Sequence, residues 1–143
     1  MDALSIPAEI FDRMLDHCRR SLPDEGCGLL AGLENSITHI YEMPNSDPSP
    51  VSYFMDPSAQ FRVMKEMREK GLVLSAIFHS HPGSPAYPSP KDISLAFYEE
   101  AVYLIVGFAD PGTPEVRGYR IVGGKVSEVK VSTGNKGQYL FDI

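Results

Sequence analysis

The apolar run LVLSAIF, residues 72–78, constrains the fold of this chain more than any other segment. An apolar run that does not alternate with polar residues is typical of a strand buried on both faces. Helical patterns flank it on both sides. Residues 56–71 begin with Asp-Pro and end at a glycine, and residues 89–100 begin with Ser-Pro, both of which are typical helix boundaries. The order predicts a fold of mixed α and β elements.

The other segments predict one more helix, further strands and a long loop. Apolar residues at a spacing of four predict a helix over residues 7–22. Residues 43–52 hold three prolines and no periodicity, which predicts a loop long enough to act as a flap over a site. The last dozen residues carry no pattern clear enough to place. Strands are predicted for residues 26–33, 36–43, 102–108, 115–121 and 125–131, with a tight hairpin turn at 122–125.

Length and composition predict a single domain, residues 1–143, with no membrane or nucleic-acid partner. The chain is 43% hydrophobic, enough for one core, and no apolar run approaches the ~20 residues that span a bilayer. The N-terminus lacks the zones of a signal peptide, so we expect a cytoplasmic protein. A net charge of -6 argues against binding a phosphate backbone. Cys18 and Cys27 form no C-x-x-C pair, which predicts buried, reduced thiols.

Two histidines at the end of the apolar run form a candidate metal site. On a strand, residues i and i+2 face the same side, so His79 and His81 can converge on one ion while Ser80 faces away. Asp92 can complete the site if the proline-rich loop folds the next helix back over the strand end. Two imidazoles and one carboxylate suit one Zn²⁺ ion and leave a fourth position for a catalytic water. Alternatively, the histidines form a surface pair or satisfy each other in the core.

The sequence also offers a candidate base and a candidate oxyanion donor. Glu25 precedes an apolar strand and could face the metal from a strand mouth, where it would take a proton from the water and pass it to a leaving amine. Ser89 and Asp92 fit a helix cap, and the Ser89 hydroxyl could also hydrogen-bond an oxyanion. Other glutamates are interpreted as solvated or turn residues: Glu34, Glu42, Glu66, Glu69, Glu99 and Glu100.

Three other classes that use related metal motifs do not fit this chain. Zinc deaminases require a P-C-x-x-C pair, which is absent from the sequence. Amidohydrolase-type sites lie on (β/α)₈ barrels of ~250 residues, longer than this chain. Cupin-like sites place a glutamate shortly after H-x-H in an all-β barrel, whereas proline and glycine follow here and helices interrupt the strands.

Glu25 ahead of CGLLAG, then HSHP at residues 79–82, then S-x-x-D from Ser89 to Asp92, resembles the JAMM (MPN+) metalloprotease motif. The resemblance covers most of the chain and implies a curved mixed sheet flanked by helices, similar to the cytidine deaminase architecture. It implies that His79, His81 and Asp92 bind zinc. It also implies that Glu25 is the general base and acid and that Ser89 stabilises the oxyanion.

The family cleaves peptide or isopeptide bonds after the C-terminal Gly-Gly of ubiquitin-like proteins. This compact chain resembles the short bacterial sulfur-carrier-cysteine peptidases, because only the short turn ADPGTP stands where eukaryotic relatives carry an insertion. The resemblance implies a zinc peptidase that acts on a ubiquitin-like sulfur carrier and releases cysteine or a short extension. The alternatives are a broader isopeptidase and a non-catalytic MPN-type scaffold, and a homodimer is left open.

Overall fold

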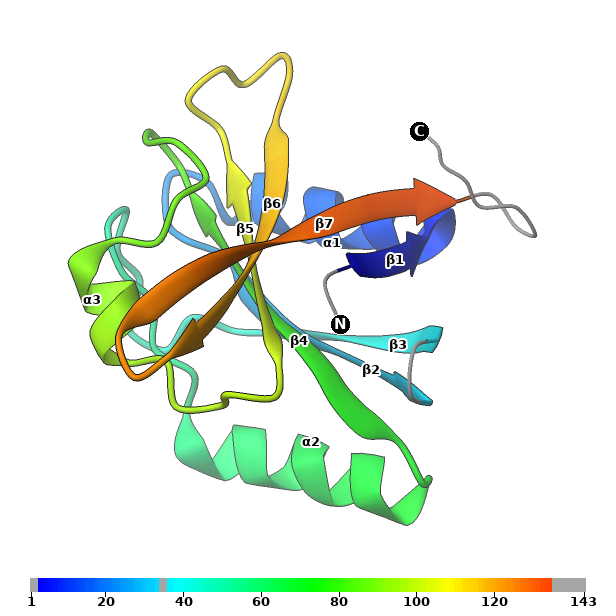
Figure 1. Ribbon diagram of the computed structural model, residues 1–143. Helices are drawn as coiled ribbons and strands as arrows, with labels where there is room; N and C mark the ends of the chain where they lie inside the picture. Colours follow the sequence, from blue (N-terminus) through cyan, green and yellow to red (C-terminus); the bar gives the residue numbers. More distant parts are fainter. Residues whose placement is uncertain (1–2, 34–35, 135–143) are drawn as a thin grey trace.

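The computed structural model describes residues 3–33 and 36–134, which form one mixed sheet with helices around it (Figure 1). The strands of the sheet follow the order β1-β7-β6-β5-β4-β2-β3. The helices are α1 (Ala8–Ser21), α2 (Pro57–Glu69) and α3 (Pro90–Ser94). The strands are β1 (Ala3–Pro7), β2 (Cys27–Leu33), β3 (Ser36–Met43), β4 (Val73–His81), β5 (Val102–Gly107), β6 (Glu115–Val122) and β7 (Lys125–Gly134).

The sheet is strongly curved. The pairs β4–β5 and β1–β7 are parallel and the other neighbouring strands are antiparallel. Although β1 and β3 are at opposite ends of the strand order, they contact each other, so the sheet curls toward a closed barrel (Figure 1). The predicted curved mixed sheet flanked by helices is therefore confirmed.

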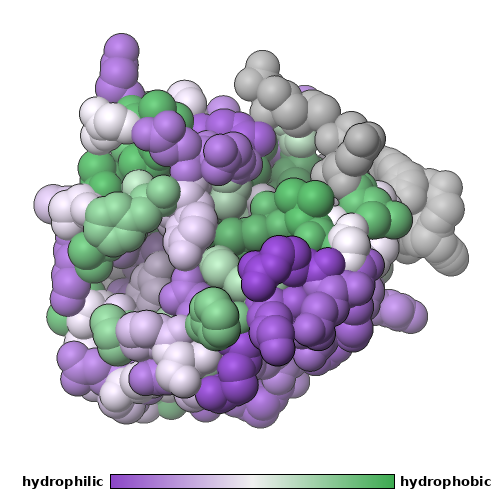
Figure 2. Space-filling view, turned by 90° about the horizontal axis from the view of Figure 1, so that it is seen from below, coloured by the Kyte–Doolittle hydropathy of each residue, from purple (hydrophilic) through white to green (hydrophobic). Residues whose placement is uncertain are grey.

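Strand β4 separates two hydrophobic clusters. Phe78 packs in the cluster that contains Met14 of α1, whereas Ile77 packs in the cluster that contains Met67 of α2. Alternate side chains of β4 thus enter opposite cores, which confirms the prediction that this strand is buried on both faces. Seen from the side of α2, much of the surface is hydrophilic and hydrophobic residues gather in separate groups (Figure 2).

The predicted helices and strands are present, with two main differences. The short strand β1 was not predicted, because it pairs in parallel with β7 and its five residues carry no pattern of their own. Strand β4 ends at His81 and carries both histidines at its C-terminal end, as predicted. The helix predicted to reach residue 100 is wrong beyond Ser94, where α3 ends.

A tertiary hydrogen bond holds the segment after α3 in a non-helical conformation. The backbone N–H of Tyr98 donates to the hydroxyl of Tyr103 at 2.9 Å, so it does not continue a helical ladder. This contact joins the segment after α3 to β5, and no local pattern of residues 95–100 encodes it.

Two predictions reach beyond the described residues. The last dozen residues are described only as far as Gly134, and Glu34 also lies outside the described ranges. Within the described part of the chain, no helix has the length and apolar character needed to cross a membrane.

Candidate metal centre

The two histidines lie side by side at the end of β4. His79 pairs in register with Cys27 of β2 on one side and with Ile105 of β5 on the other, and both imidazoles are buried. Their Nε2 atoms are 3.2 Å apart. Ser80 faces the opposite side, where its hydroxyl accepts a hydrogen bond of 2.8 Å from the backbone N–H of Gly26. The period of two in a strand therefore directs both imidazoles to one point, as predicted.

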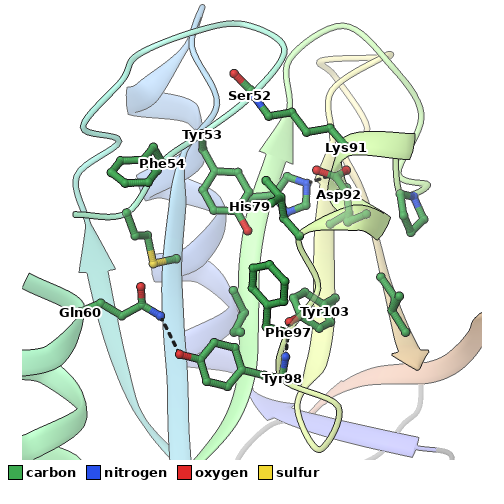
Figure 3. Close-up of a pocket in the computed structure, with 16 residues that line it drawn as sticks. Ser52, Tyr53, Phe54, Gln60, His79, Lys91, Asp92, Phe97, Tyr98 and Tyr103 are labelled. Atoms are coloured by element: carbon green, nitrogen blue, oxygen red, sulfur yellow. Dashed lines mark hydrogen bonds and ion pairs between the residues drawn. The ribbon is translucent and has the colours of Figure 1, made fainter. Parts of the chain in front are cut away.

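Helix α3 brings Asp92 to the same point. Its Oδ2 atom lies 3.2 Å from Nε2 of His79 and 3.1 Å from Nε2 of His81. The loop after β4 thus folds the start of α3 back over the strand end, as the sequence predicts. Figure 3 shows Asp92 beside His79 at the top of a cleft.

A capping box fixes the position of Asp92. The backbone N–H of Ser89 donates to Oδ2 of Asp92 at 2.9 Å, and the backbone N–H of Asp92 donates to Oγ of Ser89 at 3.1 Å. The predicted cap is confirmed. Ser89 uses only an acceptor position in this cap, so the proton of its hydroxyl is free to be donated elsewhere.

The spacing and chemistry of the three atoms fit a metal ion. Two Nε2 atoms and Oδ2 lie 3.1–3.2 Å from one another. Ligands at zinc distances of about 2.0–2.1 Å around a tetrahedral ion would be ~3.3 Å apart, which is close to this spacing. Two imidazoles and a carboxylate are borderline donors that suit zinc, and three protein ligands leave one tetrahedral position open.

The surroundings of the histidines hold their orientation. Nδ1 of His81 lies 2.8 Å from the carbonyl oxygen of Pro85, so this nitrogen carries the proton and Nε2 presents its lone pair to the metal position. The ring of Tyr53 stacks on His79 with centroids 4.7 Å apart. Sequence patterns identified neither contact, because both join segments that are separated along the chain. Nδ1 of His79 is buried and has no hydrogen-bond partner within residues 3–33 and 36–134.

The Asp92 carboxylate and the His81 imidazole shift each other's pKa values. Burial works to raise the pKa of Asp92, but hydrogen bonds from His79 and His81 outweigh it and hold that pKa well below its usual range. Burial works to lower the pKa of His81, and its hydrogen bonds to Asp92 and Pro85 reverse this and raise the pKa. Because a proton and a metal ion compete for the same imidazole nitrogens, the metal affinity of this centre should fall as pH falls.

Glu25 lies just before β2 and next to the histidines. Its backbone N–H donates to the carbonyl of Ser49 at 2.8 Å, and its carbonyl accepts from the side chain of Asn45 at 3.0 Å. Its side chain is only 3% exposed, and Oε1 has no partner among the described residues. Burial raises the pKa of Glu25 to about 8, with His81 opposing the shift and Asp92 adding to it. An unpaired buried carboxyl near the metal position is suited to proton transfer.

The two cysteines are structural. Both Cys18 and Cys27 are buried and free, as predicted. Although Cys27 lies opposite His79 in the sheet, burial raises the pKa of its thiol to about 12, so it stays protonated and is a poor metal ligand.

A cleft of about 230 Å³ opens beside the metal centre (Figure 3). Its lining comes from α2 and the segment before it, from α3 and the segments on either side of it, and from β4, β5 and β6. The predicted loop, residues 43–52, lies at this end of the molecule, since Ser49 bonds Glu25 and Ser52 lines the cleft.

The site and the fold define a metal-dependent hydrolase built on a curved mixed sheet. Residues 7–122 match the family described as prokaryotic homologs of the JAB domain. This match covers most of the 143 residues, and the chain belongs to that family. The resemblance to the JAMM motif is therefore confirmed.

Two relatives of known name are similar over much of the chain. A CysO-cysteine peptidase of Mycobacterium tuberculosis is 42% identical over 132 residues, which cover 90% of each protein. A "Probable TtuB-protein conjugate cleaving protease" of Thermus thermophilus is 39% identical over 105 residues, covering 73% of this chain and 70% of the relative.

Two solved structures share the fold. Protein DSY2949 from Desulfitobacterium hafniense superposes with a TM-score of 0.84 at 35% identity. The superposition covers 93% of this chain and 94% of the DSY2949 chain. AF2198, a JAB1/MPN domain protein from Archaeoglobus fulgidus, gives a TM-score of 0.58 at 21% identity and covers 90% of this chain and 97% of its own. The second similarity supports the predicted fold alone.

The raised pKa of Glu25 predicts how the metal-free protein responds to pH. In the folded state Glu25 keeps its proton up to about pH 8, whereas in the unfolded chain it loses the proton near its ordinary pKa of 4.5. The folded state then binds more protons between these values, so the free energy of unfolding falls as pH rises, by at most about 1.4 kcal/mol per pH unit.

Urea unfolding of the metal-free wild type and of Glu25→Gln, from pH 5 to pH 8, measures this effect. The stability of the wild type relative to the variant should decrease steadily across this range, because glutamine does not titrate. A difference that is constant with pH would show that Glu25 is not held protonated in the fold.

Proposed function

We propose that this chain is a single-domain zinc peptidase that hydrolyses the amide after the C-terminal Gly-Gly of a ubiquitin-like sulfur carrier. The observation that carries the proposal is the convergence of His79, His81 and Asp92 on one point. The buried carboxyl of Glu25 is close enough for His81 and Asp92 to shift its pKa. The relatives named for cleaving a CysO-cysteine bond and TtuB conjugates support the substrate class. Cysteine or a short extension would be the leaving group.

In this proposal His79, His81 and Asp92 hold one zinc ion. The bound ion would supply a coordinated water of lowered pKa and would polarise the scissile carbonyl. The capping box keeps Oδ2 of Asp92 in place, and the Pro85 carbonyl keeps the imidazole of His81 in the productive tautomer. These contacts exist without substrate. Little conformational entropy is therefore lost in ordering these side chains when the metal and the substrate bind.

Glu25 is the proposed general base and general acid. Without a metal, burial keeps its carboxyl largely protonated at neutral pH. A nearby cation favours the carboxylate, so loading of the site would turn Glu25 into a base. The carboxylate would then take a proton from the attacking water and give it to the leaving amine. Because its Oε1 atom has no partner among the described residues, nothing there must be displaced before it acts.

Ser89 is the proposed oxyanion donor. Its oxygen accepts the N–H of Asp92, and its own proton remains to be donated to the carbonyl oxygen of the substrate as negative charge develops there. The cap uses a lone pair of the Ser89 oxygen, and the oxyanion role uses the hydroxyl proton, so the same hydroxyl can serve both. The cap holds Ser89 next to the ligand Asp92, where the carbonyl must lie.

Two alternatives remain for test. A broader isopeptidase is favoured by the name of the Thermus relative, which acts on conjugates. A non-catalytic scaffold is disfavoured because the ligand set and the buried glutamate are all present.

The free, buried cysteines support the reducing cytoplasm as the compartment. Self-association into a homodimer stays a prediction.

A panel of ubiquitin-like sulfur carriers with residues added after Gly-Gly tests the function by intact mass. The zinc-loaded protein should remove these residues down to Gly-Gly, and a chelator should stop the reaction. Glu25→Gln should keep one zinc and lose at least about 10²-fold in turnover, because it loses proton transfer but no ligand. His79→Ala should lose most of its zinc, because only two ligands remain.

Full zinc in His79→Ala would remove this residue from the metal site. Normal turnover by Glu25→Gln would remove Glu25 from the chemistry. If all carriers stay intact while one zinc is held tightly, the scaffold alternative replaces the peptidase.

Ser89→Ala separates the oxyanion role from the cap. Loss of the cap should lower the free energy of unfolding by about 1 kcal/mol, and loss of an oxyanion donor should lower turnover by about 10²-fold. Thermal unfolding and steady-state kinetics of the same zinc-loaded variant measure the two effects. Lower stability with unchanged turnover would leave Ser89 as a helix cap only.

A further inference from the structure

Among the described residues, Lys91 is the one lysine or arginine that lines the cleft beside the metal centre. It directly precedes Asp92 on α3, and its side chain is exposed. Figure 3 shows the side chain extending from α3 toward Ser52 of the facing loop, across the top of the cleft. The positive charge therefore lies at the mouth of the cleft, next to the point where the scissile amide must bind.

Lys91 forms no ion pair among the residues that the structure describes. Several other basic residues lie within 4.0 Å of a carboxylate oxygen: Arg13, Arg20, Lys65, Lys70 and Arg117. Others among the described residues form no ion pair either, but none of them lines the cleft: Arg19, Arg62, Arg68, Arg120, Lys125 and Lys130.

The neighbouring acids do not pair with Lys91. Asp92 directs Oδ2 to the two histidines and to the Ser89 N–H. Glu25 is close enough for Lys91 to lower its pKa, but the two form no ion pair. In a chain with a net charge of -6, an unpaired lysine in this position is available to an anionic ligand.

Below Lys91 the cleft is mostly apolar and small. Phe54, Leu95 and Phe97 are at least half exposed, at 51%, 50% and 73%, and they line the cleft together with the rings of Tyr53 and Tyr98. A volume of about 230 Å³ is below the range of about 300–1,000 Å³ that holds drug-sized ligands. Such a space takes one or two amino-acid residues and not a folded protein.

We propose that this cleft is the subsite for the leaving residue, and that Lys91 binds the free α-carboxylate of that residue. The proposal rests on the peptidase function above and makes it more specific. The chain would act as a carboxypeptidase that removes a single C-terminal residue with a small or apolar side chain. Conjugates through a lysine side chain would be poor substrates, because their leaving group has no carboxylate in this position.

The chemistry is a balanced hydrolysis. Water adds its oxygen to the carbonyl carbon of the terminal glycine, the C–N bond breaks, and the leaving amine takes up a proton through Glu25. The products are a carrier that ends in a glycine carboxylate and one free amino acid. In the last residue of a chain, the scissile nitrogen and the carboxylate are attached to the same α-carbon. The carboxylate therefore lies within a few bonds of the scissile amide, in the cleft that Lys91 and Asp92 both line.

The test uses the carrier that the zinc-loaded protein cleaves fastest in the panel above, prepared in two versions. Both end in Gly-Gly-Cys, one with a free carboxylate and one with a carboxamide. The zinc-loaded wild type should prefer the carboxylate on the order of 10- to 100-fold in kcat/KM, mainly through a lower KM, as expected for a hydrogen bond between charged groups. Lys91→Met should bring the ratio of the two kcat/KM values close to one, and Lys91→Arg should retain much of the wild-type ratio. The ratio within one variant is compared because Lys91 also lowers the pKa of Glu25, and a change there affects both carriers alike.

Lys130→Met is the matched control, since Lys130 is an exposed lysine of β7 that does not line the cleft. It should leave both rates unchanged. Zinc content and the thermal midpoint of the Lys91 variants should equal those of the wild type. The side chain of Lys91 has no hydrogen-bond or ion-pair partner in the described part of the chain, and its carbonyl accepts bonds from Ser94 and Leu95.

Two results would overturn this inference while the peptidase function stands. One is equal cleavage of both carriers by the wild type, and the other is an equal loss on both carriers in Lys91→Met. Failure of the wild type to cleave either version would overturn the peptidase function and this inference with it.

Discussion

The carboxylate of Asp92 connects the fold to the metal centre. The same Oδ2 atom accepts the N–H that starts α3 and contacts both histidines of β4. A helix cap stabilises a protein by about 1 kcal/mol, and here the capping geometry also places a metal ligand within 3.2 Å of its partners. Folding of the loop between β4 and α3 and assembly of the centre are therefore one event. Movement of α3 would remove a ligand, the candidate oxyanion donor Ser89 and Lys91 together.

The fold is less stable than it could be at Glu25, where the proposed chemistry requires a buried carboxyl without a partner. A buried carboxyl without a partner is unfavourable in a folded protein, yet Glu25 is 3% exposed and its Oε1 atom is unpaired among the described residues. Hydrogen bonds of its backbone to Ser49 and Asn45 hold it there. The adjacent Ser80 hydroxyl fixes the start of β2 through Gly26. The carboxyl is thus positioned by main-chain contacts, which leave its side chain free to exchange a proton.

Local patterns in the sequence predicted the parts of the site that depend on local geometry. The period of two in a strand placed His79 and His81 on one face, and the pattern S-P-x-D predicted the cap that holds Asp92. Tyr53, the Pro85 carbonyl and Lys91 were not identified as parts of the site, because their roles depend on contacts between segments. The same reason applies to the fold. Strand β1 forms only by pairing with β7, and α3 ends where Tyr98 bonds Tyr103.

X-ray absorption at the zinc edge of the purified, zinc-loaded protein tests the central claim most directly. The account predicts a first shell of nitrogen and oxygen donors at about 2.0–2.1 Å, with the outer-shell scattering of two imidazole rings and no sulfur. A sulfur donor at about 2.3 Å would place Cys27 or Cys18 in the first shell. That result, or the signal of fewer than two imidazoles, would contradict a centre made of His79, His81 and Asp92.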